Sequence, residues 1–311
     1  MNINYFDALS RAWNRMVTAL FRPFDLGKWF VIGFTAFLAG LLDSRGGGGG
    51  GGSRHRFHRH DDFGDVLALP GIAWDWLMDH PGWFTLIILG IFFLIVLIIV
   101  LTWLSSRGKF MFLDNVVHNR AKVTQPWHDF RKQGNSLFLW RIGFGLVILA
   151  GIILFLIQIF YIASDIYDGG FSPRLIAPIL GIGLLFLFFI IVIAFISAFL
   201  NNFVVPIMYK NRIATTQAWH RFLSIFSKHW IYFLLYGVFL FVLYILMVIG
   251  IIIAGLMTCC IGFLLLIIPY IGSVVSLPIS YAFMALGPEF LVQFGPEFDI
   301  FPHDETATAT T

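Results

Sequence analysis

The sequence predicts an all-α, polytopic integral membrane protein with about six transmembrane helices. Three observations support this prediction. Hydrophobic residues make up 59% of the 311 residues and charged residues only 12%, against about 25% charged residues in an average soluble domain. The apolar residues gather in runs of about 20, the length that crosses a bilayer. A half-polar motif recurs ahead of several of these runs.

The candidate transmembrane spans follow the runs of apolar residues. The first holds only about 14 residues, or roughly 21 Å of helix, so it either begins earlier, near Phe21, or is re-entrant. Pro269 and Pro278 predict a bend in the sixth. The six spans are Trp29–Leu42, Trp83–Leu104, Leu137–Ala163, Leu175–Leu200, Trp230–Leu256 and Gly262–Leu286.

The distribution of lysine and arginine predicts the orientation of the chain. The N-terminal segment and the second and fourth loops, counted with Arg141, hold fifteen of these cations, whereas the other three loops hold five. Because cytoplasmic segments carry the excess, we expect a bacterial inner-membrane protein with both termini in the cytoplasm. No cleavable signal peptide is expected, since Asp7, Arg11 and Arg15 precede the first apolar run.

A twelve-residue motif occurs twice, as NRAKVTQPWHDF over residues 119–130 and NRIATTQAWHRF over residues 211–222, with seven letters in common. A further, degenerate copy, SRAWNRMVTALF, occupies residues 10–21, and the three copies are numbered in chain order, so this copy is the first. At helical spacing each copy has an aromatic and aliphatic stripe, and in the first and third copies the cations lie away from it. Such helices are stable in the plane of the cytoplasmic interface, with aromatic rings at the acyl boundary and cations at the headgroups.

Each copy precedes an odd-numbered span, which predicts a single membrane domain, 1–311, built from three repeats. Each repeat is an interfacial amphipathic helix followed by a helical hairpin. The repeats are 1–111, 112–203 and 204–288, and a disordered tail is expected over 289–311. The helices either fix the depth of the bundle or contact lipid headgroups or a partner through Trp13, Arg15, Trp127, His128, Trp219, His220 and Arg221.

The first repeat contains a Gly/His-rich outer loop over residues 43–65, including a run of seven glycines. Its histidines His55, His58 and His60 are weak candidates for a transition-metal site, because imidazoles bind such ions and carboxylates follow closely. Arginines stand between these histidines and repel a cation. We therefore expect a solvated insertion, no metal site and no cofactor.

No enzyme is expected from the sequence. It contains no Walker A loop, HExxH or GxSxG motif, and no acidic residue in the middle of a predicted span. The letters GPEF occur at 287–290 and again at 295–298. Because Gly-Pro pairs break helices, we expect both copies to form turns where the chain leaves the sixth span.

The span ending in NNFVVPIMYKNR, the following TTQAWHRF helix and the KHW that opens the next span carry a family resemblance. This pattern resembles the membrane domain found beside glycerophosphodiester phosphodiesterase domains in some bacteria, and in stand-alone multi-pass proteins. The resemblance covers Phe199–Phe239 well and Phe112–Ile148 less well. In that family the phosphodiesterase activity belongs to a separate soluble barrel, so the resemblance implies no catalytic residue here.

The leading functional hypothesis is a non-enzymatic membrane protein that acts at the cytoplasmic interface. It would scaffold an unidentified membrane or cytoplasmic protein, or bind lipid headgroups of the bilayer, because the polar feature that recurs is interfacial. The alternative is a transporter for a neutral or lipid-like solute, since internal repeats are common in carriers. Nucleic acid is not an expected partner, because the net charge is only +3 and is not gathered into one basic patch.

Overall fold

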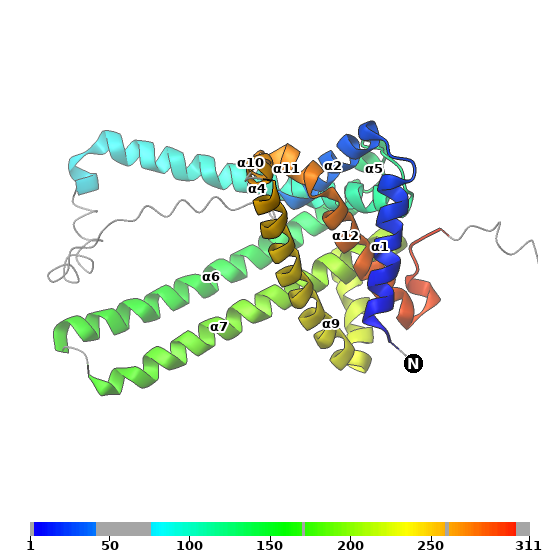
Figure 1. Ribbon diagram of the computed structural model, residues 1–311. Helices are drawn as coiled ribbons and strands as arrows, with labels where there is room; N and C mark the ends of the chain where they lie inside the picture. Colours follow the sequence, from blue (N-terminus) through cyan, green and yellow to red (C-terminus); the bar gives the residue numbers. More distant parts are fainter. Residues whose placement is uncertain (1–2, 42–75, 170–171, 259–260, 303–311) are drawn as a thin grey trace, which may run out of the picture. The chain divides into compact units, whose positions relative to one another are not determined.

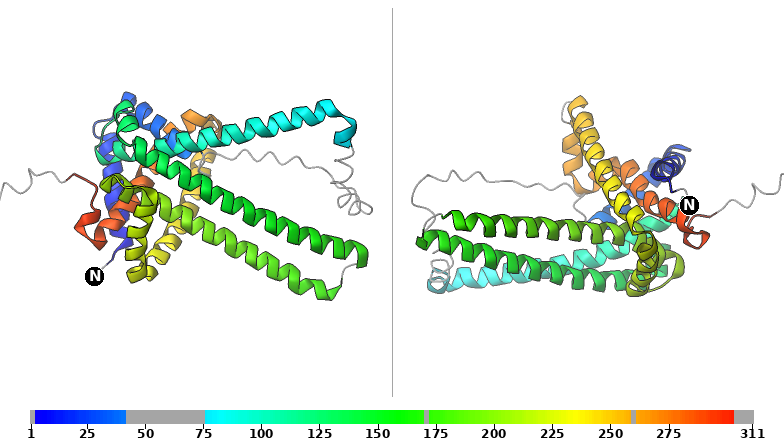
Figure 2. Two further views of the ribbon diagram at one scale, coloured as in Figure 1. Left: turned by 180° about the vertical axis from the view of Figure 1, so that it is seen from behind. Right: turned by 90° about the horizontal axis from the view of Figure 1, so that it is seen from below.

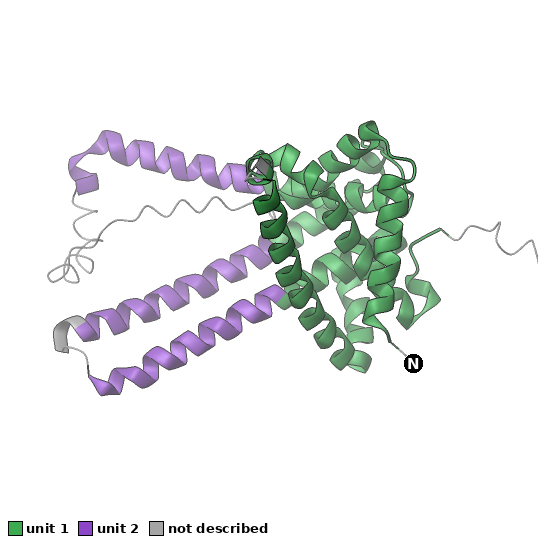
Figure 3. Ribbon diagram, in the orientation of Figure 1, with its two compact units in different colours: residues 1–49, 101–141, 195–311 green, residues 50–100, 142–194 purple. Residues whose placement is uncertain are grey.

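The computed structural model of the protein describes residues 3–41, 76–169, 172–258 and 261–302, and all secondary structure in these ranges is helical (Figure 1 and Figure 2). The all-α prediction is confirmed over these ranges. The chain forms two compact units (Figure 3). Unit 1 holds residues 1–49, 101–141 and 195–311, and unit 2 holds residues 50–100 and 142–194.

Within the described ranges, four helical segments are long and apolar enough to cross a membrane. They coincide with the second to fifth predicted spans, and the chain is a membrane-embedded helical protein. The segments are α4 (Pro81–Val117), α6 (Arg131–Gly169), α9 (Thr215–Met257), and the uninterrupted run of η1 (Pro173–Leu175), α7 (Ile176–Phe199), the π-helix η2 (Leu200–Val204) and α8 (Val205–Asn211).

The first predicted span, Trp29–Leu42, is not one of these four segments. The helix there, α2 (Leu26–Gly40), has 15 residues. Its length of about 22 Å falls short of a hydrocarbon core of roughly 30 Å. It packs along the C-terminal end of α4, where the Ser105 hydroxyl donates to the carbonyl oxygen of Ala39 at 3.0 Å. A Cβ on Gly108 would lie 2.7 Å from the backbone nitrogen of Ala39, so this close packing requires glycine.

The sixth predicted span, Gly262–Leu286, is broken into three helices. Pro269 and Pro278 stand in the first turns of the second and third, where a missing N–H is tolerated. The bend there is 66°, which confirms the predicted bend. With the bent pair counted as one span, the described residues hold five segments able to cross, and the count of six stays a prediction. The three helices are α10 (Ile261–Ile267), α11 (Pro269–Val275) and α12 (Leu277–Leu291).

Unit 2 consists of apolar segments of α4, α6 and α7. The last two lie side by side in Figure 1 and Figure 2. They meet at Phe155, whose ring centroid lies 5.0 Å from that of Phe186 and 5.4 Å from that of Phe189. Most other side chains of the unit are exposed, and Leu184 is 66% exposed. Exposed apolar surface opposes solubility by about 25 cal/mol per Å² in water, so this unit is suited to lipid.

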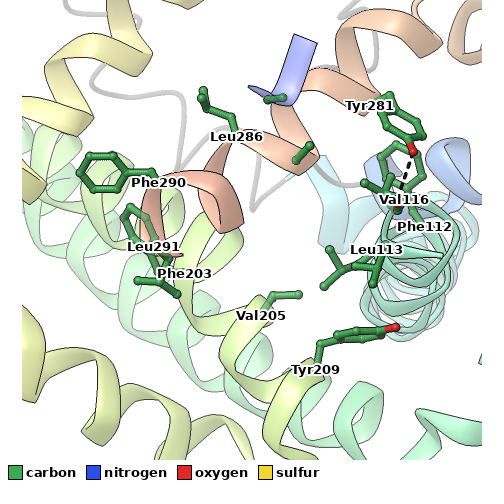
Figure 4. Packing of buried hydrophobic residues seen from close by; sticks show 14 of the residues in the cluster. Phe112, Leu113, Val116, Phe203, Val205, Tyr209, Tyr281, Leu286, Phe290 and Leu291 are labelled. Carbon is green, nitrogen blue, oxygen red and sulfur yellow. Dashed lines mark hydrogen bonds between the residues drawn. The ribbon is translucent and has the colours of Figure 1, made fainter. Parts of the chain in front are cut away.

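The core of unit 1 joins segments that are far apart in the sequence (Figure 4). Phe203 on η2 stacks on Phe222 of α9 with 5.3 Å between ring centroids, and lies 5.9 Å from Phe290 on α12. The Tyr281 hydroxyl of α12 donates to the carbonyl oxygen of Val116 in α4 at 3.0 Å. Each fully buried ring of this kind contributes about 1.5–3 kcal/mol, so these contacts hold the four helices together.

The three motif copies adopt three different local structures. The first lies within α1 (Tyr5–Phe21), and the second consists of the connection after α4, the short helix α5 (Thr124–Asp129) and its C-cap Phe130. The third is continuous with the fifth predicted span in α9, whose backbone is non-helical at His229, with φ of −134°. This kink falls beside Trp230, where the span was expected to begin. The threefold repeat of helix and hairpin stays a prediction.

The prediction of a disordered tail over 289–311 is wrong for residues 289–302. Glu289 lies in α12, and two 3₁₀ turns follow, η3 (Val292–Phe294) and η4 (Pro296–Phe298). Aromatic packing orders this segment: Phe294 stacks on Phe233 with 4.8 Å between ring centroids, and Phe301 is 5% exposed. Residues 303–311 lie outside the described ranges.

Candidate functional site

The two close copies of the motif begin where helices end. Asn119 follows α4 and Arg212 follows α8, and both have left-handed backbones, with φ of 50° and 55°. Asparagine adopts this conformation readily. Its amide oxygen accepts a hydrogen bond from Lys28 Nζ at 2.7 Å, and Lys28 also donates to the carbonyl oxygen of Ala19 at 2.7 Å. Burial lowers the pKa of Lys28, while the carboxylate of Asp25 acts in the opposite direction.

The second and third copies pack against each other in unit 1. The Ser136 hydroxyl accepts from the backbone N–H of Thr215 at 2.9 Å and lies 3.1 Å from the Thr215 hydroxyl. Arg212 Nη1 donates to the carbonyl oxygen of Asp129 at 3.0 Å. Its guanidinium carbon lies 4.1 Å from the ring centroid of Phe130. Two segments that are distant in the sequence therefore form one surface.

The two motif tryptophans pack on protein. Trp127 and Trp103 enclose the guanidinium of Arg107, whose carbon lies 4.8 Å and 4.5 Å from their ring centroids. Trp219 stacks on Trp140 with 5.5 Å between ring centroids, and its Nε1 finds no acceptor among the described residues. Both motif indoles are half-buried, so each places a large share of its surface against unit 1 and not at the acyl boundary.

The cations in and directly after the two packed copies are exposed, except Arg120, which is half-buried. Segments 119–132 and 211–228 are fully described, and their only carboxylate is the exposed Asp129. His128 and His220 are exposed in the same segments. We define the basic surface as the six exposed cations of these segments: Lys122, Arg131, Lys132, Arg212, Arg221 and Lys228.

The first copy has a different environment, because α1 packs on α12. The cation of Arg15, expected at the headgroups, forms an ion pair with Glu289 and lies 3.7 Å from the ring centroid of Phe301. Arg11 Nε lies 3.4 Å from the other oxygen of the same carboxylate. Trp13 is 53% exposed and lines an apolar cavity. Trp13 and Arg15 therefore do not belong to the basic surface, because Trp13 lines the cavity and Arg15 pairs with Glu289.

Glu289 is a charged residue that sequence reasoning missed. The expectation that GPEF at 287–290 forms a turn is wrong, because all four residues lie in α12. Gly287 is required there, since a Cβ would collide with the carbonyl oxygen of Asn202 on η2. The sequence feature that could have indicated a buried acidic partner is the pair Arg11 and Arg15. These residues are one helical turn apart, so both can contact one carboxylate.

A second missed residue is Asp114, which was expected in a loop because the second span was predicted to end at Leu104. It lies in α4 and is 1% exposed. Arg120 donates to its Oδ2 from Nη2 at 2.7 Å and from Nε at 3.1 Å. The Tyr209 hydroxyl donates to its Oδ1 at 2.8 Å, and His118 Nδ1 lies 3.3 Å from the same oxygen. A cavity of about 440 Å³ adjoins this group.

The π-helix η2 carries a further polar group. Lys109 Nζ donates to Asn201 Oδ1 at 2.7 Å, and Arg141 Nη2 donates to the same oxygen at 3.2 Å. Arg141 Nη1 also donates to the Ser105 hydroxyl at 3.2 Å. Wide π-turns of this kind occur often at functional positions. Here the π-helix presents one amide oxygen to two cations from different helices.

The weak metal candidates His55, His58 and His60 lie outside the described residues. In the ranges that the structure describes, no group of three His, Cys, Asp or Glu side chains is placed to hold a metal ion.

Comparison with known proteins gives one match. The model of a protein family described as a family of unknown function (DUF7544) matches residues 3–294, a range that contains all three motif copies, the basic surface and Glu289. No curated protein and no solved structure matches the chain. Since the match covers nearly the whole sequence, the chain belongs to this family of unknown function.

Proposed function

We propose that the protein is a non-enzymatic membrane protein whose basic surface binds the anionic headgroups of membrane lipids. One observation carries this proposal: segments 119–132 and 211–228 pack side by side and expose six cations, and Asp129 is the only carboxylate in these two segments. These cations lie between the apolar stretches of long helices, and the ends of spanning helices lie at headgroup level. Each lysine or arginine near an anionic leaflet contributes about 1 kcal/mol.

The proposal places the basic surface on the cytoplasmic side of a bacterial inner membrane, by the excess of cations there. Contacts in unit 1 support both termini on one side. The backbone N–H of Asn4 donates to Gln293 Oε1 at 2.8 Å, and Gln293 Nε2 donates to the carbonyl oxygen of Asn4 at 3.1 Å. The ion pair of Arg15 with Glu289 joins the same two segments. Both termini lie on one side of the membrane when the chain crosses it an even number of times.

The test is the lipid preference of the full chain in nanodiscs of mixed phosphatidylglycerol and phosphatidylcholine. Native mass spectrometry measures which lipids stay bound as the nanodisc is removed. The wild type is expected to retain phosphatidylglycerol. The triple variant Arg131→Gln, Lys132→Gln and Arg221→Gln is expected to lose up to about a hundredfold of this preference, at about 1 kcal/mol for each cation.

The matched control is Arg174→Gln, which removes an exposed cation of unit 2. It is expected to keep the wild-type preference. Equal preference in the wild type and the triple variant would overturn the proposal. A change in the Arg174 variant of one third of the triple variant's change in free energy, that is, the same change for each cation removed, would show a general effect of net charge, and would also overturn it.

A transporter for a neutral or lipid-like solute is the second candidate, and one observation favours it. The α11–α12 pair is bent by 66° at Ser276, and discontinuous helices often form the substrate sites of carriers. Substrate-dependent flux into proteoliposomes that contain the full chain would place this candidate first. The resemblance to membrane domains beside glycerophosphodiester phosphodiesterases stays a prediction, as does the scaffolding of a partner protein.

A further inference from the structure

Unit 1 contains an apolar cavity that is separate from the basic surface. Its volume is about 810 Å³, within the roughly 300–1,000 Å³ of small-molecule sites. Helices α1, α9, α10, α11 and α12 supply its walls, and none of the six basic-surface cations lines it. Representative wall residues are Phe6 and Trp13 of α1, Met247 and Ile251 of α9, and Phe283 and Leu286 of α12.

Two breaks in the helices open this space. Thr258 ends α9 ahead of α10, and Ser276 separates α11 from α12. Both residues line the cavity. Gly250 on its wall leaves further space, since a Cβ there would meet no described atom within 4 Å. The break at Ser276 is one of those that divide the sixth predicted span.

Water is a poor occupant of this cavity. Three hydroxyl-bearing residues line it, Ser10, Thr258 and Ser276. The Thr258 hydroxyl donates to the carbonyl oxygen of Ala254 at 3.0 Å, and the Ser276 hydroxyl donates to that of Gly272 at 2.8 Å. Bound water needs two to four polar partners, and most of the wall is hydrocarbon. The cavity therefore favours an apolar occupant.

The surroundings of α9 indicate which apolar molecule is available to fill the cavity. The apolar stretch of this helix is almost wholly unburied, and Leu246 on the cavity wall is 58% exposed. In a bilayer, acyl chains surround such a surface. An empty recess in it would lose the dispersion contacts that a chain supplies. We propose that the cavity binds an acyl chain of a membrane phospholipid.

The dimensions of the cavity fit a chain lying along α9. The lining residues of this helix run from Leu243 to Thr258. At a rise of 1.5 Å per residue this is about 22 Å. One leaflet of a bilayer is about half of the roughly 30 Å hydrocarbon core. The cavity is therefore long enough for the acyl chain of one leaflet.

The cavity also gives the first motif copy a role of its own. Phe6, Leu9, Ser10 and Trp13 lie at i, i+3, i+4 and i+7 on α1, and this one face lines the cavity. The neighbouring side of α1 carries Arg11 and Arg15, whose ion pairs with Glu289 anchor α1 to α12. In this arrangement α1 is a fixed wall, and Trp13 faces the bound chain.

The experiment uses a phospholipid with a diazirine in its acyl chain, incorporated into phosphatidylcholine nanodiscs with the full-length protein. After irradiation, mass spectrometry maps the labelled residues. Wild-type protein is expected to be labelled on the wall, at Met247, Ala254 or Phe283, in preference to Ile249 and Ile253, which are exposed on α9 but do not line the cavity. Labelling of the two sets to an equal extent would overturn the proposal.

A filling variant provides the second arm. Gly250→Phe places a ring in the cavity, and wall labelling is expected to fall at least about tenfold, a factor that the lost contact of two methylene groups would produce. The matched control is Gly183→Phe on α7, where a Cβ also meets no described atom within 4 Å. Unchanged labelling in Gly250→Phe, or an equal loss in Gly183→Phe, would overturn the proposal.

Two further measurements complete the design. Ala254→Phe fills the cavity from the next turn of α9 and replaces Gly250→Phe where that variant does not give a monodisperse protein. A free fatty acid carrying the same diazirine tests the source of the chain: labelling of the wall by the fatty acid alone would overturn the assignment to phospholipid. The basic-surface triple variant is expected to keep wild-type wall labelling, so this proposal and the proposed function fail separately.

Discussion

Arg15 on α1 forms an ion pair with Glu289 on α12, although 274 positions separate the two residues in the sequence. Arg11 contacts the other carboxylate oxygen, with 3.4 Å between Nε and Oε2. The Glu289 side chain is 3% exposed, so its charge requires compensation by these two cations. The ion pair therefore fastens the N-terminal helix to the end of the last long helix.

Glu289→Gln is expected to destabilise unit 1, because it leaves Arg11 and Arg15 beside a neutral amide. Breaking a buried pair costs about 3–5 kcal/mol. The two arginines are 42% and 40% exposed, so the lower end of that range is expected. Thermal unfolding in detergent measures the effect. The matched control is Glu297→Gln in the second GPEF sequence, where the side chain is exposed and a change within about 0.5 kcal/mol is expected.

Asp114→Asn is expected to lower stability by about 3–5 kcal/mol, because Arg120 loses its buried carboxylate. The control is Asp129→Asn, an exposed residue whose contact with Arg212 uses the backbone carbonyl oxygen. Urea or thermal unfolding of the two variants should separate them clearly. Equal stability of both variants would contradict the central position of Asp114.

Gly287→Ala is expected to disrupt the packing of α12 on η2, because a Cβ there collides with the carbonyl oxygen of Asn202. Overpacking of this kind costs about 1–3 kcal/mol. Gly183→Ala makes the same chemical change where a Cβ meets no described atom within 4 Å, and its higher helix propensity should leave stability unchanged or raise it by up to about 1 kcal/mol. A lower melting temperature for Gly183→Ala than for Gly287→Ala would show that this contact is not formed.

The sidedness of the termini can be measured with single cysteines in a variant that lacks Cys259 and Cys260. Asp7→Cys, Ser227→Cys and Glu297→Cys replace exposed residues and are expected to label from the same side of the membrane. Arg174→Cys precedes α7 and should label from the opposite side, since Pro173–Asn211 is long enough to cross. Labelling of Asp7→Cys and Glu297→Cys from opposite sides would exclude an even number of crossings.

The long helices of this protein could be predicted from local patterns in its sequence. Runs of apolar residues located four long helices, and two prolines located the bend between α11 and α12. The kink at His229 falls beside the expected boundary at Trp230. These features are local: hydrophobic periodicity and proline geometry act within one or two helical turns, so they can be recognised along the chain.

The contacts of the polar residues in the candidate sites depend on how distant helices pack together. The motif led us to expect Trp127 and Arg15 at the membrane interface. Instead, Trp127 packs on Arg107, and Arg15 forms an ion pair with Glu289. The partners lie far away in the sequence, and the free energy that selects them comes from burying a charge beside its counter-ion. Periodicity along the chain does not predict these partners, because they come together only when α1, α4 and α12 pack.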